Sequence, residues 1–282
     1  MPNAPTFLSA ALAYLKSGRR CRYVGRLIEH FGETPISQID QAAIDAAALA
    51  LCPNVTPATR NVTVYTPVSA ILHFSGLKPN LRRPAGAKGL VRVDYLTVED
   101  AAAIIAEARK FDPEFAALLT FLLYTGCRLG EALALTWDRV ELPNRYAYIG
   151  ETKNGDPRPL VLRPDLVAVL QSLRPDNGCG RVFRFKQGGW LKRRLLRARL
   201  AVSGLPNPGR GVKAPPHRLS WVTFHTFRHT WATWMRRYSG VDVQGLVATG
   251  NWRDPRSAAR YSHVSPREEW QKVDQLPALK VV

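Results

Sequence analysis

Residues 224–230 read FHTFRHT, which places two histidines and an arginine on a segment of aromatic residues and threonines. His225 and Arg228 are three residues apart, so they share one face of a helix, and His229 lies one turn after His225. A zinc site of the H-E-x-x-H type needs a glutamate where Thr226 stands. Because no carboxylate lies nearby, we expect no metal site here. The natural partner of this helix face is an external anion.

Three other segments carry residues of related chemistry. YTGCRLGEALAL places Arg128 at a glycine-bounded helix start, where backbone N–H groups and the helix dipole favour anions. Lys153 lies at the expected tip of a hairpin. Tyr261, in RYSH, carries a phenol that could attack a phosphorus atom if a base and a positive field activate it. Each alone has an ordinary explanation, as an ion-pair arginine, a solvated lysine or a packed tyrosine. Their ordered combination is what indicates a site.

The charge of the chain indicates a polyanionic partner. The 282 residues include 40 Lys and Arg against 22 Asp and Glu, which gives a net charge of +18. Between Asp176 and Asp242 there is no acidic residue, whereas the basic residues there are Arg181, Arg184, Lys186, Lys192, Arg193, Arg194, Arg197, Arg199, Arg210, Lys213, Arg218, Arg228, Arg236 and Arg237. A surface whose charges are nearly all positive produces an electrostatic potential that attracts polyanions. The alternatives are a solubilising face and, through WLKRRLLRARL at 190–200, an anionic membrane surface.

Composition excludes several other classes. Hydrophobic residues make up 46% of the chain, enough for a packed core. No apolar run reaches the roughly 18 residues of a membrane span, and the N-terminus reads as a helix rather than a signal peptide. The four cysteines are scattered without a C-x-x-C pair, which fits a reducing cytoplasm. There is no G-x-G-x-x-G or Walker loop, so we expect no cofactor.

Hydrophobic periodicity and turn residues predict two domains. Residues 6–15, 20–32, 35–51 and 56–76 have helical spacing, with an N-cap expected at Thr6 and a C-cap at Gly32. Residues 78–89 are rich in Pro, Gly and charge, as linkers are. Residues 96–111 and 113–124 are predicted helices, and 145–162 alternate around an Asn-Gly-Asp-Pro turn, as in a β-hairpin. We therefore expect a helical domain at 1–80, a linker at 81–92 and a second domain at 93–282.

The ordered motifs resemble those of the tyrosine recombinases, the phage-integrase family. TGCRLGEALALTW is similar to the first arginine motif, T-G-x-R-x-x-E-x-x-x-L-x-W. ETKNGDPRPLVL is similar to the hairpin that carries the catalytic lysine, HTFRHTWAT to H-x-L-R-H-T-x-A-T, and ATGNWRDPRSAARYSH to L-G-H-S-S…R-Y-x-H. The likeness covers about residues 90–265, and the order and spacing of its motifs are specific.

The resemblance implies a role for each of these positions. It assigns the catalytic residues Arg128, Lys153, His225, Arg228, Trp252 and Tyr261, with Glu131 in a supporting acidic position and His229 as a structural neighbour. The usual histidine after L-G is missing. Some members carry G-G-W, so Trp252 is assigned there, and its indole N–H can donate to a phosphate oxygen. The alternatives are Asn251 in that role, or a Trp252 that only packs in the core. If Lys153 is not the general acid, the nearest basic alternative is Arg158.

The resemblance also implies fold and activity. We expect a mainly α fold with a small antiparallel sheet (α+β), in which a helical, SAM-like core-binding domain precedes the catalytic domain. The implied activity is site-specific DNA recombination through a 3′-phosphotyrosyl link, without metal or ATP, by a homo-tetramer on paired double-stranded sites of a phage or mobile element. Accessory DNA-bending proteins are possible partners, and the expected location is the cytoplasm, at the nucleoid. Further expected DNA contacts are Arg60, Lys192, Arg193 and Arg197.

Two alternatives remain at this point. One is a topoisomerase-like enzyme that relaxes DNA by the same cleavage chemistry without exchanging strands. The other is a non-catalytic DNA-binding regulator on a degenerate fold of this kind. The presence of every reactive residue type speaks against the regulator, and supercoiled plasmids with and without paired sites would separate recombination from relaxation.

Overall fold

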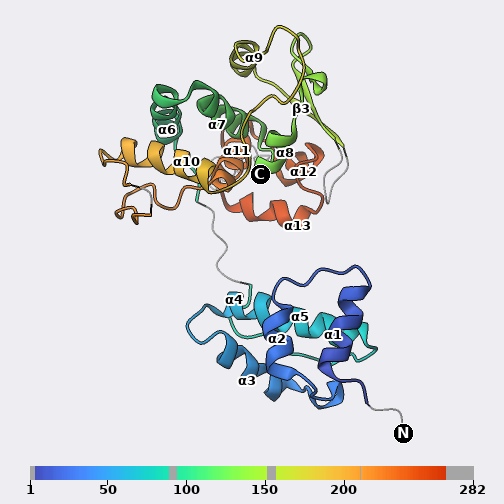
Figure 1. Ribbon diagram of the computed structural model, residues 1–282. Coiled ribbons are helices and arrows are strands. Elements are labelled where there is room, and N and C mark those ends of the chain that lie inside the picture. Colours follow the sequence, from blue (N-terminus) through green and yellow to red (C-terminus); the bar gives the residue numbers. More distant parts are fainter. Residues whose placement is uncertain (1–3, 89–93, 151–156, 210, 265–282) are drawn as a thin grey trace, which may run out of the picture. The chain divides into compact units, whose positions relative to one another are not determined.

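The chain folds into two units, and each has its own hydrophobic core. The computed structural model describes residues 4–88, 94–150, 157–209 and 211–264. The units comprise Met1–Val91 and Arg92–Val282, drawn from blue to red in Figure 1. Among the helices described, none has the length and apolarity that a bilayer crossing needs.

The first unit is a small helical bundle. Its described helices are α1 (Phe7–Lys16), α2 (Val24–Phe31), α3 (Gln41–Leu51), α4 (Pro57–Arg60) and α5 (Thr66–Phe74), with a 3₁₀ turn at Ile36–Gln38. Short polar side chains begin α1, α3 and α4, where they accept hydrogen bonds from unpaired backbone N–H groups of the first turn. Thr6 accepts from the N–H of Ser9, and Asp40 from that of Ala43.

The last predicted helix of this unit, 56–76, is not regular throughout. A π-helical turn at Asn61–Tyr65 joins α4 to α5. The Tyr65 hydroxyl donates to Asp45 of α3 at 2.5 Å between the oxygens. Burial and this bond raise the pKa of Tyr65 to about 12.

The first part of the predicted linker lies against the first unit. The backbone N–H of Arg82 donates to the Gln41 side chain at 2.9 Å, and Leu77 and Leu81 pack against the core of the unit. A Cβ on Gly86 would lie 3.8 Å from Pro57. Of the predicted linker, 81–92, residues 89–92 fall outside the described part of the chain.

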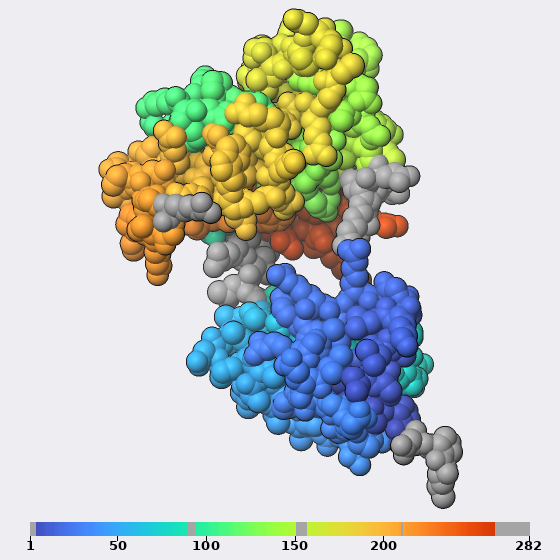
Figure 2. All heavy atoms as spheres, viewed as in Figure 1, coloured from blue at the N-terminus to red at the C-terminus, as the bar shows by residue number. Residues whose placement is uncertain are grey.

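The second unit is built around α7 (Pro113–Thr125), which is buried on nearly all sides. The other described helices are α6 (Val98–Phe111), α8 (Leu129–Ala134), α9 (Pro164–Gln171), α10 (Gly189–Val202), α11 (Phe224–Ser239), α12 (Val243–Ala248) and α13 (Pro255–Ala258), with 3₁₀ turns at Trp137–Arg139 and Ala259–Val264. Helix α7 packs against α6, α8, α9 and α11. Helix α10 and the segment after it lie at the surface, where their yellow and orange atoms are visible in Figure 2.

A small antiparallel sheet completes the second unit. Its order is β1 (Val140–Glu141), β2 (Tyr146–Ile149), β3 (Arg158–Val161). Ala147 pairs with Leu160, and both are buried, whereas Tyr146 and Val161 on the other face are exposed. The predicted fold class, mainly α with a small antiparallel sheet, is confirmed. The strands of the predicted hairpin are present, and its turn at 151–156 lies outside the described residues.

Gly126 ends α7 and allows the close approach of α11. Its φ is +64°, in the left-handed region, and its N–H bonds to the carbonyl of Leu122. A Cβ at this position would lie 2.3 Å from Cε3 of Trp231 on α11. Glycine is therefore required twice, for the backbone angle and for the space.

We predict that Gly126→Ala destabilises the second unit by about 2 kcal/mol more than Gly204→Ala does, because overpacking adds to the backbone strain. Gly204 is a matched control, since its φ is +68° but its Cβ would meet nothing within 4 Å. All seven tryptophans lie at or after residue 137, so urea unfolding followed by tryptophan fluorescence reports on this unit. Equal losses in the two variants would contradict the proposed contact with Trp231.

Candidate active site

The site begins where α8 starts. Arg128 precedes the helix with an extended backbone, and its N–H donates to Oε2 of Glu131 at 2.8 Å. Its guanidinium Nη1 also donates to Oε1 of Glu131 at 2.9 Å. The Arg128 side chain is 53% exposed, whereas that of Glu131 is 7% exposed. A buried carboxylate thus anchors an arginine whose head reaches solvent.

Glu131 is shared between two arginines. Nη2 of Arg158, the first residue of β3, lies 2.6 Å from Oε2 of Glu131. Burial alone would raise the pKa of Glu131, but the hydrogen bonds from Arg158 and Arg128 outweigh it and hold the pKa below its usual value. Glu131 is therefore charged at neutral pH.

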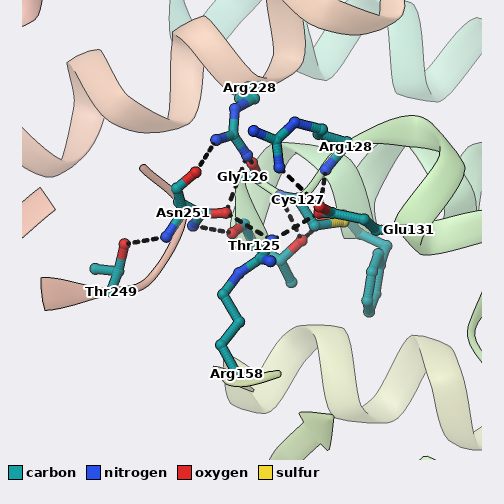
Figure 3. A network of polar contacts seen from close by, with 10 residues as sticks. Thr125, Gly126, Cys127, Arg128, Glu131, Arg158, Arg228, Thr249 and Asn251 are labelled. Carbon is teal, nitrogen blue, oxygen red and sulfur yellow. Dashed lines mark hydrogen bonds and ion pairs between the residues drawn. The ribbon is translucent and has the colours of Figure 1, made fainter. Parts of the chain in front are cut away.

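Asn251 connects this pair to the second predicted arginine. Its Oδ1 accepts from Nη2 of Arg158 at 3.1 Å and from Nη1 of Arg228 at 3.0 Å. Its backbone oxygen accepts from Nη2 of Arg228, and its Nδ2 donates to the carbonyl of Thr125 at 3.2 Å. Figure 3 shows Asn251 lying between the two guanidinium groups. One continuous network thus joins the start of α8, strand β3, helix α11 and the loop after α12.

The guanidinium of Arg228 is held on several sides. Its Nη1 donates to the carbonyl of Gly126 at 2.5 Å, and its Cζ lies 4.3 Å from the ring centroid of Trp252. Burial and the nearby charge of Arg128 lower the pKa of Arg228 to about 10. At neutral pH it therefore keeps its charge in an environment that favours an added anion.

Two predicted residues lie together beside Arg228. Tyr261 is 2% exposed, and its ring lies 5.3 Å from that of Trp252 between centroids. The Tyr261 hydroxyl is 2.6 Å from Nδ1 of His229, and either atom can donate, depending on the imidazole tautomer. Burial raises the pKa of Tyr261 to about 12. Burial, followed by the proximity of His225, lowers the pKa of His229 to about 4, so this pair is neutral at pH 7.

A cavity of about 680 Å³ opens in front of the arginines. Arg128, His225 and Arg228 line it, together with Lys192 of α10. Burial and three nearby arginines lower the pKa of His225, so its imidazole is neutral at pH 7. Cys127 also lines the cavity, but burial raises its pKa to about 12. It is therefore a protonated thiol and a poor nucleophile.

The structure brings most of the predicted site residues together. Arg128, His225 and Arg228 line one cavity, and Trp252 lies against the Arg228 guanidinium. Tyr261 is not among the lining residues and packs against Trp252 and His229. Within the described part of the chain, the Trp252 indole N–H makes no hydrogen bond. Lys153 lies outside the described residues. No group of His, Cys, Asp and Glu residues in the described ranges could hold a metal ion.

The four further predicted DNA contacts differ in their surroundings. Lys192 lines the cavity, and Arg193 is exposed with Nη2 3.4 Å from the carbonyl of Pro208. The Arg197 guanidinium lies 4.2 Å from the ring centroid of Phe111. Arg60 instead donates to the backbone oxygens of Cys52 and Pro53, so it closes the segment after α3.

Sequence reasoning gave Arg158 and Asn251 only as alternative catalytic groups, whereas the structure shows them as the connection between Glu131 and Arg228. One signal was available for Arg158. It stands two residues before the buried Leu160 on β3, so strand alternation places it on the inward face. No local pattern indicates what Asn251 bonds.

The family model and the similar proteins all point to one family, the phage integrases. The model of the phage integrase family matches residues 94–268, more than half of the chain. The chain is 29% identical to the shufflon-specific DNA recombinase of Escherichia coli over 156 residues, covering 55% of this chain and 35% of that protein. It is 22% identical to the integrase of Salmonella phage P22 over 206 residues, covering 67% and 48%. The chain thus spans about a third to a half of the length of these relatives.

Solved structures show the same fold. A structure of the Tn1549 transposon integrase in complex with circular intermediate DNA matches with a TM-score of 0.72 at 14% identity, covering 97% of this chain and all of that one. A lambda integrase dimer bound to a core site matches with a TM-score of 0.63 at 17% identity, covering 99% and 81%. Likeness at this identity concerns the fold alone.

We predict that Glu131→Gln destabilises the second unit by about 3 kcal/mol, because Arg158 is left as a buried cation without a counter-charge. The matched control is Glu107→Gln, whose partner Lys110 is 69% exposed and whose ion pair is worth only about 0.5 kcal/mol. Urea unfolding followed by tryptophan fluorescence measures both. A loss in Glu131→Gln no larger than the control's would show that Asn251 alone satisfies Arg158.

Proposed function

The chain belongs to the phage integrase family, and on that premise we propose that it is a site-specific DNA recombinase of the tyrosine type. It cleaves and rejoins DNA strands through a covalent link between Tyr261 and a 3′ phosphate. The observation that carries the proposal is the joining of Arg128 and Arg228 to one buried network at the edge of a single open cavity. The whole protein's substrate and partners are part of the proposal.

The two arginines bind the reacting phosphate in this proposal. Planar guanidinium groups match pairs of phosphate oxygens. The extra negative charge of a pentacoordinate phosphorus forms between Arg128 and Arg228, which are already oriented by Glu131 and Asn251. Groups held in place before the reaction lower the barrier most, since they need no reorganisation.

The covalent step exchanges one phosphodiester bond for another. The Tyr261 oxygen bonds to phosphorus as the bond from phosphorus to the 5′ oxygen breaks. The phenol proton leaves with assistance from His225, whose neutral imidazole can accept it. Lys153 protonates the departing 5′ oxygen, as the family resemblance implies. The phosphotyrosyl ester keeps the bond energy, so rejoining needs no ATP.

Trp252 and His229 support this step. Trp252 lies over the Arg228 guanidinium and beside the Tyr261 ring, so it holds both groups at one spacing. The indole N–H remains available for a phosphate oxygen. His229 contacts the Tyr261 hydroxyl and fixes where the phenol rests before reaction.

Double-stranded DNA is the proposed partner. The net charge of +18 and the acid-free stretch between Asp176 and Asp242 supply the positive field that a phosphate backbone requires. One similar structure is described as a lambda integrase tetramer bound to a Holliday junction. By that analogy we propose a tetramer on paired sites of a phage or mobile element, acting at the nucleoid, with the first unit as a DNA-binding domain.

We predict that Tyr261→Phe binds DNA almost normally but forms no covalent adduct, because only the attacking oxygen is removed. The substrate is duplex DNA from the regions that flank the coding sequence, and adducts are read on denaturing gels. Tyr238→Phe is the matched control, since Tyr238 is 62% exposed on α11. An adduct formed by Tyr261→Phe would place the nucleophile elsewhere. If DNA binding and Tyr261 adducts occur without strand exchange between paired sites, the protein is a relaxing enzyme rather than a recombinase.

We also predict that Lys153→Ala cleaves ordinary DNA slowly but cleaves 5′-phosphorothiolate DNA about as fast as the unaltered protein. A bridging sulfur leaves as a thiolate and hardly needs a proton, so the missing acid no longer matters. Tyr261→Phe, which lacks the nucleophile, should gain nothing from the sulfur. Failure of the sulfur to restore Lys153→Ala would reject Lys153 as the acid.

A further inference from the structure

The cavity in front of the arginines is larger than one phosphate group requires. Its volume of about 680 Å³ lies within the roughly 300–1,000 Å³ of pockets that take whole small-molecule ligands, so one phosphate group fills only part of it. Besides Arg128, His225 and Arg228, the wall includes Arg139, Lys192 and Gln187, set among apolar residues such as Leu135 and Ile149. We refer to Arg139, Lys192 and Gln187 as the outer wall. Lys192 is an expected DNA contact, whereas the family resemblance gives no role to Arg139.

The guanidinium of Arg139 packs directly against the backbone of Gly150. It ends the 3₁₀ turn before β1, and Gly150 follows β2. A Cβ at Gly150 would lie 1.6 Å from Nη1 and 2.8 Å from Cζ of Arg139. The guanidinium therefore occupies the space that any side chain at 150 would take.

The backbone itself does not demand a glycine at 150. Its φ is not among the positive values of the chain, so other residues could adopt this conformation. The contact with the guanidinium is what a side chain at 150 would prevent. Gly150 therefore leaves the space in which the Arg139 guanidinium lies beside the cavity.

The charge of this outer wall is uncompensated within the described residues. No acidic side chain of that part of the chain pairs with Arg139 or Lys192. Arg184 and Arg194, in contrast, both pair with the buried Asp112. Two exposed cations added to Arg128 and Arg228 on one concave surface raise the local potential and favour more than one anion.

We propose that Arg139, placed by Gly150, forms with Lys192 a second phosphate subsite that binds a backbone phosphate near the reacting one. The subsite fixes how the strand lies in the cavity, since contacts to phosphates set the register of a protein on DNA. This inference rests on the proposed function, because it takes the Arg128 and Arg228 end of the cavity as the place of the reacting phosphate.

The test measures the salt dependence of binding by the full chain to a short duplex of arbitrary sequence. Each phosphate contact contributes about −0.9 to the slope of log K against log salt concentration. Arg139→Ala should therefore make this negative slope shallower by about 0.9. Gly150→Ala should make it shallower by a similar amount although no charge is lost, because the added methyl displaces the guanidinium. The double variant should equal Arg139→Ala, since Gly150 acts only through Arg139.

Arg145→Asn is the matched control for charge. Arg145 lies between β1 and β2 outside the residues that line the cavity, and its φ of 59° suits asparagine. It should keep the slope of the unaltered protein. A slope in Arg139→Ala equal to that of the control would overturn the subsite. An unchanged slope in Gly150→Ala, or a further loss in the double variant, would overturn the placement by Gly150. If the unaltered protein does not bind duplex DNA, the proposed function itself fails.

Discussion

The carboxamide of Asn251 lies between two buried guanidinium groups, and the rest of the site depends on this arrangement. Arg158 and Arg228 are 5% and 3% exposed, and like charges so deep in a protein repel each other strongly. Asn251 accepts one hydrogen bond from each, while Glu131 supplies the counter-charge to Arg158. The network links all of these groups, and it tolerates one unsatisfied atom, since Nε of Arg158 is buried without a partner among the described residues. It connects the start of α8, strand β3, helix α11 and the loop after α12.

The arginines differ in whether an acidic side chain neutralises their charge, and this distinguishes the ones that stabilise the fold from the ones that face the cavity. Arg184 binds both Asp112 and Glu114, so its charge is neutralised within the protein. Glu131, in contrast, is shared by Arg158 and Arg128, and Arg228 has only neutral partners. The cavity therefore carries net positive charge as long as no anion is bound. A ligand that binds only the folded state adds stability, so DNA should stabilise the second unit most where this charge is concentrated.

Local pattern was sufficient to predict α6 and α7 and to place Arg128 at a helix start and His225 and Arg228 on one helix, because helical spacing and a glycine-bounded helix start are properties of neighbouring residues. It missed that the predicted helix at 35–51 is divided into a 3₁₀ turn at Ile36–Gln38 and α3, which Asp40 caps. It was not sufficient for contacts between distant segments. Asn251 meets Arg158 across 93 residues, and nothing in the sequence around either records the other. The contact of Arg139 with Gly150 is similarly invisible, since the glycine would ordinarily be explained by a turn.

The burial of Tyr261 bears on how the proposed reaction must work. With a pKa of about 12, the phenol is protonated at neutral pH and rests against the neutral His229. Burial makes a free phenolate costly, whereas the charges of Arg228 and Arg260 favour it. The phenol therefore stays protonated at neutral pH until a phosphate is bound. In the proposed reaction its proton leaves with the assistance of His225 as the new bond to phosphorus forms, and the negative charge is shared with oxygens held by Arg128 and Arg228. Catalysis then depends more on the placement of positive charge than on a strong base. This explains why a site with two neutral histidines and a single buried carboxylate could cleave DNA.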